Sequence, residues 1–378
     1  MILATLLLPL FYLSTTNGDD TLLGVQVLWR HGARPPEVIF DYDPHKNDWP
    51  VPLGELTPLG MRQHYDLGKR LMQRYGEEYK LINTSYNVGE IYVRSTDVNR
   101  ALASAYSNLA GMFSESKNTY PDSNWPSQWT PIPVHTVPDT DDNLLNPTFY
   151  CPRLYQLSDE RLQTKQFLIF ENTFSSLFDY LTLHSGANIS NYKSLKKLYG
   201  TIRVEKYFNY SQPSWVTDDI FKQMESFVNS SVNYSYGCAG FGLPEDKELI
   251  SLKEGHLVWQ MIDNMKTMKN NGKIEKYIAY SAHDTTLMSF ANVLGAKVKI
   301  MGQGLIDFAA SFLLELWKDE NGNYYIKLFY ANNAYGDFTP VTHLIRGCIN
   351  QDKCSLDDFE NGTSDYLHHH PQDHCTAV

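Results

Sequence analysis

Residues 22–36 of this chain read LLGVQVLWRHGARPP, an apolar run that leads directly into charged side chains. Residues 25–29 are rich in β-favouring side chains, and the glycine and two prolines that follow end the strand that they predict. Arg30, His31 and Arg34 therefore stand at the carboxyl end of a buried strand.

Two later segments repeat this pattern of a short apolar strand, charged residues and then a helix. Residues 89–113 place Arg100 in the first turn of the expected helix, and residues 274–295 place His283 and Asp284 directly after the expected strand. Strands that alternate with helices predict an α/β fold with a mainly parallel, doubly wound sheet and helices on both faces. Ligands bind beyond the carboxyl ends of such strands, so we expect the three segments to converge on one crevice.

The middle of the chain loses this alternation. Residues 124–250 are rich in Pro, Tyr, Asn and Ser, with helical patterns around 161–184 and 218–232. We interpret this segment as a mainly helical cap inserted into an α/β core that comprises residues 19–123 and 251–378.

The first eighteen residues carry no charge and are apolar from Ile2 to Leu13. This pattern is typical of a secretory signal peptide, although the usual Lys or Arg before the apolar run is missing. The alternatives are a buried N-terminal strand or a short anchor, but the run is too short to span a bilayer. No later stretch has the length and apolarity of a membrane helix.

Sequons and cysteines also favour the secretory route. A protein made on this route can be extracellular, lysosomal or a venom component, and we expect one of these locations. Six Asn-x-Ser/Thr sequons begin at Asn83, Asn188, Asn209, Asn229, Asn233 and Asn361. Five cysteines are available for disulfides there. Cys348 and Cys354 are close enough in sequence to close a small loop, while Cys151, Cys238 and Cys375 leave one thiol over.

The formal net charge of −11 argues against nucleic acid or an anionic membrane as the main partner. An anionic substrate then requires a local cluster of cations that outweighs the overall field. No spacing typical of a metal site, such as CxxC or HExxH, is present, so we expect neither a metal nor a cofactor. The three histidines at 368–370 are interpreted as a solvated tail.

The residues 30–36, Arg-His-Gly-Ala-Arg-Pro-Pro, are suited to binding a phosphate. A guanidinium gives paired hydrogen bonds to phosphate, and two of them at a strand end are costly without an anion. We expect Gly32 to let the backbone turn so that these side chains face one side. One alternative is that the two arginines form salt bridges under a loop while His31 is a core histidine with its hydrogen bonds satisfied. Another is that Asp284 is a helix cap rather than a proton donor.

These motifs together resemble the histidine acid phosphatase family, whose signature is R-H-G-x-R-x-P followed by a late H-D. The resemblance covers nearly all of the chain after the signal peptide and is to the prostatic, lysosomal and insect venom type rather than to fungal phytases. Further matching segments are Leu56–Met61, His64–Tyr65, Arg94–Arg100, Cys151–Arg153 and Tyr280–Thr286.

The resemblance implies a role for each matching residue. His31 corresponds to the nucleophile and Asp284 to the general acid. The residues that correspond to the phosphate-binding groups are Arg30, Arg34, Arg100 and His283. We expect Arg94 to form an ion pair at its strand end instead. The implied disulfides are Cys151–Cys375 and Cys348–Cys354, with Cys238 unpaired.

The expected function is therefore a secreted, metal-free acid phosphatase that acts on small phosphate monoesters through a phosphohistidine. Alternatives within the enzymes are a phytase-like phosphatase of restricted specificity or a sugar-acid mutase. An alternative of another class is a secreted venom or binding protein that keeps the fold, but the intact catalytic residues argue against it. Relatives of this type are often homodimers.

Overall fold

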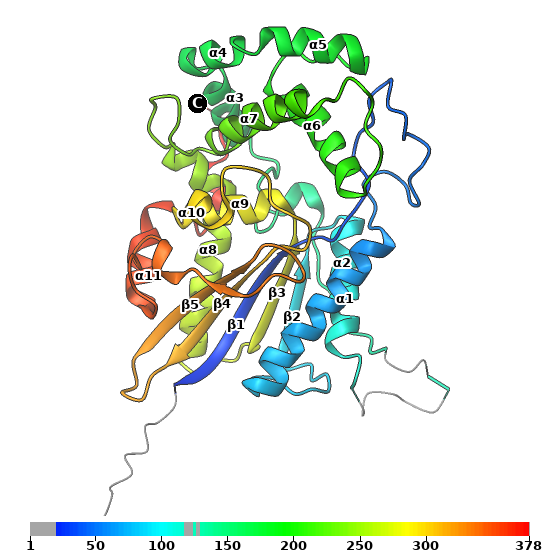
Figure 1. Ribbon diagram of the computed structural model, residues 1–378. Helices are drawn as coiled ribbons and strands as arrows, with labels where there is room; N and C mark the ends of the chain where they lie inside the picture. The colour runs from blue at the N-terminus through cyan, green and yellow to red at the C-terminus, as the bar shows by residue number, and fades with distance from the viewer. Residues whose placement is uncertain (1–19, 117–123, 126–128, 378) are drawn as a thin grey trace, which may run out of the picture.

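The computed structural model describes residues 20–116, 124–125 and 129–377. The expected signal peptide, residues 1–18, lies outside them. A seven-stranded sheet in the order β2-β3-β1-β4-β5-β6, with β7 also pairing with β5, forms the centre of the described chain (Figure 1). The strands are β1 Thr21–Arg30, β2 Ile91–Ser95, β3 Tyr277–Ala282, β4 Ser311–Lys318, β5 Tyr324–Ala331, β6 Thr339–Pro340 and β7 Cys354–Ser355.

The three strands anticipated from the sequence lie side by side and run parallel. Arg30 is in register with Ala282, and Ser95 is in register with Ser281, so β1, β3 and β2 end at the same edge of the sheet. The α/β fold class is thereby confirmed. Beyond β1, the strands β4 to β7 pair antiparallel, an extension that the sequence patterns did not indicate.

Helices cover both faces of the sheet because alternate side chains of β1 point to opposite sides. Val25, Val27 and Trp29 pack into one apolar cluster with α1 and α2, and Leu28 joins another with α8 and α9. Figure 1 shows α1 and α2 on one side and α8 on the other. The core helices are α1 Pro58–Met72, α2 Asn99–Met112, α8 Lys247–Lys269, α9 Asp284–Val293, α10 Lys297–Met301 and α11 Leu356–Thr363, and a π-helical turn, Gln73–Glu78, extends α1.

Five further helices lie together beyond the carboxyl edge of the parallel strands (Figure 1). They are α3 Pro152–Leu162, α4 Lys165–Asn172, α5 Ser175–Ser185, α6 Tyr192–Tyr207 and α7 Asp218–Ser235. Their side chains form a separate apolar cluster around Phe167 and Phe227. The sequence patterns located α4, α5 and α7 but neither α3 nor α6. The cap boundaries at 124 and 250 remain an interpretation.

Both disulfides implied by the resemblance are confirmed. Cys151–Cys375 joins the start of α3 to the C-terminal segment, and Cys348–Cys354 closes a short loop before α11. Cys238 is free, and burial raises the pKa of its thiol to about 11. Across the described residues, none of the helices combines the length and apolarity needed to cross a membrane.

The sequons differ in their accessibility. Asn83, Asn188, Asn209 and Asn361 are exposed, and Asn229 is half-buried. Asn233 is buried, and its Nδ2 atom donates to the backbone and side chain of Gln303 at 3.2 and 2.9 Å. A glycan would have to attach to this same nitrogen, so the folded environment of Asn233 disfavours glycosylation there.

Candidate active site

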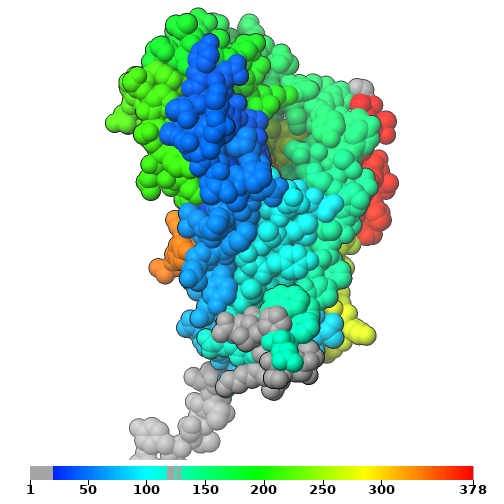
Figure 2. Space-filling view, turned by 90° about the vertical axis from the view of Figure 1, so that its right-hand side faces the viewer, coloured from blue at the N-terminus to red at the C-terminus, as the bar shows by residue number. Residues whose placement is uncertain are grey.

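A cavity of about 700 Å³ opens at the carboxyl edge of β1, β2 and β3. Figure 2 shows the surface hollowed between the blue segment that follows β1 and the green part of the chain. Six residues singled out from the sequence all line this cavity: Arg30, His31, Arg34, Arg100, His283 and Asp284. The three strand ends therefore do converge on one crevice.

The imidazole of His31 is held in one tautomer. Its Nδ1 atom lies 2.9 Å from the carbonyl oxygen of Gly32, and because a carbonyl only accepts, Nδ1 must carry the hydrogen. Nε2 then bears the lone pair and makes no hydrogen bond within the described chain. Burial lowers the pKa of His31 well below its usual value, as do Arg30 and Arg100, so the ring is neutral even in acid.

The loop after His31 is fixed by side chains from α1 and α2. The backbone N–H of Gly32 donates to Ser104 Oγ at 3.0 Å, and that of Ala33 donates to Gln63 Oε1 at 2.8 Å. A Cβ atom on Gly32 would lie 2.4 Å from the Gly60 carbonyl oxygen. Gly32 does not have a positive φ, so the glycine is required for close packing against α1 rather than for the sharp turn expected from the sequence.

Arg30 is buried and oriented by three contacts. Its Nη1 donates to the carbonyl of Ile306 at 2.6 Å, its guanidinium lies 4.3 Å from the ring centroid of Phe308, and its Nη2 is 3.1 Å from Asp284 Oδ2. Burial lowers the pKa of Arg30 to about 10, which still leaves it fully charged in acid. A fixed cation therefore stands beside the predicted proton donor.

Arg34 and Arg100 share one carboxylate, that of Glu37. Glu37 Oε1 lies 3.3 Å from Arg34 Nη2 and accepts from Arg100 Nη2 at 2.7 Å. The Glu37 side chain is 54% exposed at the cavity, where an incoming phosphate would compete with it for both arginines. Glu37 could not be identified from the sequence, because its position after two prolines carries no signal of its contacts.

His283 and Asp284 occupy the start of α9. The Thr96 hydroxyl lies 2.9 Å from His283 Nε2, and Asp284 Oδ1 accepts from the Thr285 N–H at 2.8 Å. Burial and Arg100 lower the pKa of His283 to about 3, so its ring is neutral. Burial alone would raise the pKa of Asp284, but the cations, Arg30 foremost, outweigh it and hold that pKa well below its usual range.

Arg94 lies outside this cluster, as expected. Its Nη2 donates to Asp142 Oδ1 at 2.6 Å, and it does not line the cavity. Among the residues that the structure describes, no group of three or more His, Cys, Asp or Glu side chains is placed to hold a metal ion.

The chain as a whole is also similar to known proteins. The family model of the histidine phosphatase superfamily, branch 2, matches residues 21–331. The chain belongs to this family. It is 32% identical to the lysosomal acid phosphatase of Xenopus laevis, over 95% of this chain and 80% of that protein. It is 34% identical to the prostatic acid phosphatase of Rattus norvegicus, over 89% and 84%.

Solved structures with this fold include two bacterial phytases. The phytase of Citrobacter braakii superimposes with a TM-score of 0.66 at 16% identity, covering 95% of this chain and 100% of that one. The phytase of Hafnia alvei in complex with tartrate gives 0.67 at 14% identity, covering 94% and 99%. These likenesses show the fold alone. The family expected from the sequence is confirmed, and so is the enzyme class, a phosphoric monoester hydrolase of the acid phosphatase type.

Proposed function

We propose that this member of the histidine phosphatase superfamily hydrolyses small phosphate monoesters in acid, with His31 as the nucleophile and Asp284 as the general acid. The observation that carries the proposal is the state of His31. Its Nδ1 lies within hydrogen-bonding distance of the Gly32 carbonyl, and the lowered pKa of the ring favours an unprotonated Nε2 inside a cavity lined by arginines. A neutral imidazole next to cations is suited to attack an anionic phosphoryl group.

The first step transfers the phosphoryl group to the enzyme. A bond forms between His31 Nε2 and phosphorus as the bond from phosphorus to the ester oxygen breaks in line with it. Arg30, Arg34 and Arg100 bind the equatorial oxygens, with His283 beside them, and their positive charge offsets the charge that develops there. Since the one carboxylate of Glu37 contacts both Arg34 and Arg100, it must release them when the substrate binds.

Asp284 supplies the proton for the leaving oxygen. In the empty site the surrounding cations keep its carboxyl group ionised, although burial is the largest single influence on its pKa and acts to raise it. A bound phosphate offsets the charge of these cations, and burial then raises the pKa so that Asp284 holds a proton. After the alcohol leaves, water attacks the phosphohistidine, gives a proton back to Asp284 and releases phosphate.

The proposal also covers the role of the helical cap and the route by which the protein is made. Helices α3 and α6 contribute residues to the cavity, so we propose that the cap limits which esters can reach His31. The Cys151–Cys375 disulfide and the four exposed sequons support synthesis on the secretory route. Its relatives include proteins described as lysosomal and as prostatic acid phosphatases.

The experiment is an assay with p-nitrophenyl phosphate in acid, with and without EDTA, on the parent and on His31→Ala. The parent should hydrolyse the ester equally well with the chelator, because arginines supply the positive charge. His31→Ala should retain less than a few per cent of the activity with an unchanged melting temperature. An inactive parent, or an active and folded His31→Ala variant, would refute the proposal.

A further inference from the structure

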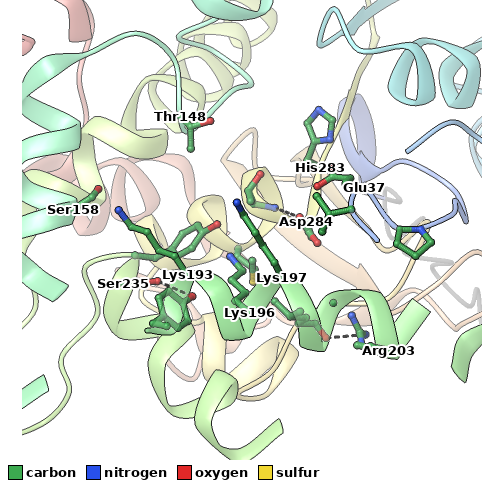
Figure 3. Close-up of a pocket in the computed structure, with 18 of the residues that line it drawn as sticks. Glu37, Thr148, Ser158, Lys193, Lys196, Lys197, Arg203, Ser235, His283 and Asp284 are labelled. Carbon is green, nitrogen blue, oxygen red and sulfur yellow. Dashed lines mark hydrogen bonds between the residues drawn. The ribbon is translucent and has the colours of Figure 1, made fainter. Parts of the chain in front are cut away.

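The cavity contains more positive charge than the phosphate-binding cluster uses. Figure 3 shows Lys193, Lys196 and Lys197 extending from α6 into the cavity that also holds His283 and Asp284. Five further cations line it, four from α6 and one from α8: Lys193, Lys196, Lys197, Arg203 and Lys253. In a chain with a formal net charge of −11, this local excess is unexpected.

Two of these cations are neutralised by carboxylates. Lys193 Nζ lies 2.7 Å from Asp159 Oδ1, and Arg203 Nη2 lies 2.8 Å from Asp307 Oδ1. Lys196 and Lys253 differ, because no carboxylate of the described residues lies within 4.0 Å of either ammonium group. An ammonium group removed from water without a counter-ion is costly, so its position calls for an anion.

Lys196 and Lys253 flank the same aromatic ring. The Nζ atoms lie 5.5 and 4.8 Å from the ring centroid of Tyr236, which is itself buried. Lys253 is only 7% exposed. Burial, followed by the charge of Lys196, lowers the pKa of Lys253 to about 8, so Lys253 remains protonated in acid.

Neither lysine forms a close ion pair with a neighbouring group of the described chain. Burial lowers the pKa of Lys196, but the Tyr192 and Tyr236 hydroxyls and the more distant Asp284 carboxylate outweigh burial and raise that pKa above its usual value, so this ammonium also stays protonated. The carboxyl group next to Lys253 in the sequence, Glu254, is buried, and neither of its oxygens has a hydrogen-bond partner among the described residues. Burial, with Asp142, raises the pKa of Glu254 well above its usual value, so this carboxyl group is neutral in acid.

We propose, on the basis of the proposed function, that Lys196 and Lys253 form a second anion subsite in the cavity. It binds the second anionic group of a phosphate monoester whose phosphoryl group lies at His31. Tyr192, whose hydroxyl lies 3.1 Å from Ser235 Oγ, lines the same part of the cavity. The substrate class is therefore a phosphate monoester that carries a further carboxylate or phosphate.

The charge of Lys196 also reaches the catalytic carboxyl group. Lys196 follows Arg30 among the cations that lower the pKa of Asp284. An anion bound between Lys196 and Lys253 would reduce that effect and would favour the protonated form of Asp284. Lys253 is the better residue for the test, because it is not among the groups that shift the pKa of Asp284 most.

The test compares matched substrates on matched variants. The substrates are alkyl phosphates of increasing chain length that end in a carboxylate, in a second phosphate or in the uncharged primary amide. The variants are the parent, Lys253→Met and Lys193→Met, where Lys193 serves as a cavity-lining lysine that already has a carboxylate partner. Lys253→Gln provides a polar replacement if the methionine variant does not fold.

For the parent, at one chain length, we expect kcat/KM to be about 10- to 100-fold higher with the charged end than with the amide, mostly through KM. Lys253→Met should remove this preference, and Lys193→Met should keep it. The carboxylate and phosphate series show which anion the subsite favours. Removal of an uncompensated charge should also leave the melting temperature of Lys253→Met unchanged or raise it.

Two results would overturn the inference: a parent without preference for a charged end at any chain length, or a preference that survives in Lys253→Met and Lys253→Gln. Hydrolysis of the amide series separates these results from failure of the proposed function. If the parent hydrolyses the amide and His31→Ala does not, the phosphatase assignment stands and only the second subsite is refuted. If the parent does not hydrolyse any of the series, the proposed function itself is wrong.

Discussion

Replacement of Asp284 can distinguish its proposed role as a proton donor from a purely structural role as a helix cap. Asp284→Asn keeps one oxygen, which can accept from the Thr285 N–H as Oδ1 does at 2.8 Å in the parent, but an amide nitrogen replaces Oδ2, the atom 3.1 Å from Arg30 Nη2, and the side chain has no acidic proton to give. Asp284→Ala removes both contacts as well as the acid. The two variants therefore share the loss of the general acid and of the ion pair with Arg30, and they differ in the loss of the cap.

The expected magnitudes differ between substrates and between variants. General acid catalysis contributes about 10²–10⁴-fold, so both variants should slow an alkyl phosphate by that factor. A p-nitrophenolate leaves with little need for a proton, and its release should slow by less than about tenfold. Only Asp284→Ala should lose the cap, at a cost of about 1 kcal/mol, whereas both variants leave Arg30, which is 3% exposed, without its carboxylate and should lose stability for that reason.

The assay measures kcat and kcat/KM for p-nitrophenyl phosphate and for a simple alkyl phosphate at equal folded concentrations, with thermal melting of each variant. The reasoning is refuted if Asp284→Asn slows both esters by the same factor. In that case, Asp284 would act through structure or charge, and the proton donor would be another group.

Three further predictions concern pH, packing and modification. Turnover of alkyl phosphates should fall as pH rises, because Asp284 must hold a proton in the complex, and Asp284→Asn should lose this dependence. The lowered pKa of His31 keeps its ring neutral in acid, so His31 should cause no further change of rate with pH in that range. A pH–rate profile of the parent and of the variant checks both statements. Gly32→Ala should destabilise the fold by about 1–3 kcal/mol, because the added Cβ clashes with Gly60. Gly200→Ala is the control and should not destabilise the fold, because its Cβ meets no atom within 4 Å. Equal melting temperatures of the two variants would contradict this prediction. Peptide mapping after secretion from insect cells should find glycans at exposed sequons such as Asn361 and none at Asn233, and a glycosylated Asn233 would show that the folded environment was misjudged.

The sequence allowed accurate prediction of the residues that follow the three parallel strands. An apolar run followed at once by charged residues marks a strand end, and parallel strands end at one edge of the sheet. Arg30, Arg100 and Asp284 were therefore placed together although the first and the last lie far apart in the chain. The resemblance to a family then supplied their roles, which periodicity alone does not provide.

Other features depend on contacts that leave no local pattern. Glu37 lies in a loop and Lys253 in a helix, and neither segment has a sequence motif that indicates a binding site. Only the fold brings these two residues to the cavity. The burial of Asn233 depends on Gln303, far away in the chain. The close approach of Gly32 to Gly60 is likewise a tertiary contact, so the sequence correctly marked the glycine but gave the wrong reason for it.

The central claim is that His31 carries the phosphoryl group during turnover. The most direct test mixes the enzyme with radiolabelled phosphate monoester, quenches the reaction in alkali within one turnover and maps the labelled peptide by mass spectrometry. Alkali is used because a phosphohistidine is hydrolysed in acid. We predict one phosphoryl group on the His31 imidazole, absent from His31→Ala and from unreacted enzyme. A label on another side chain, or rapid turnover of the parent with no trapped phosphohistidine in the first turnover, would contradict the mechanism.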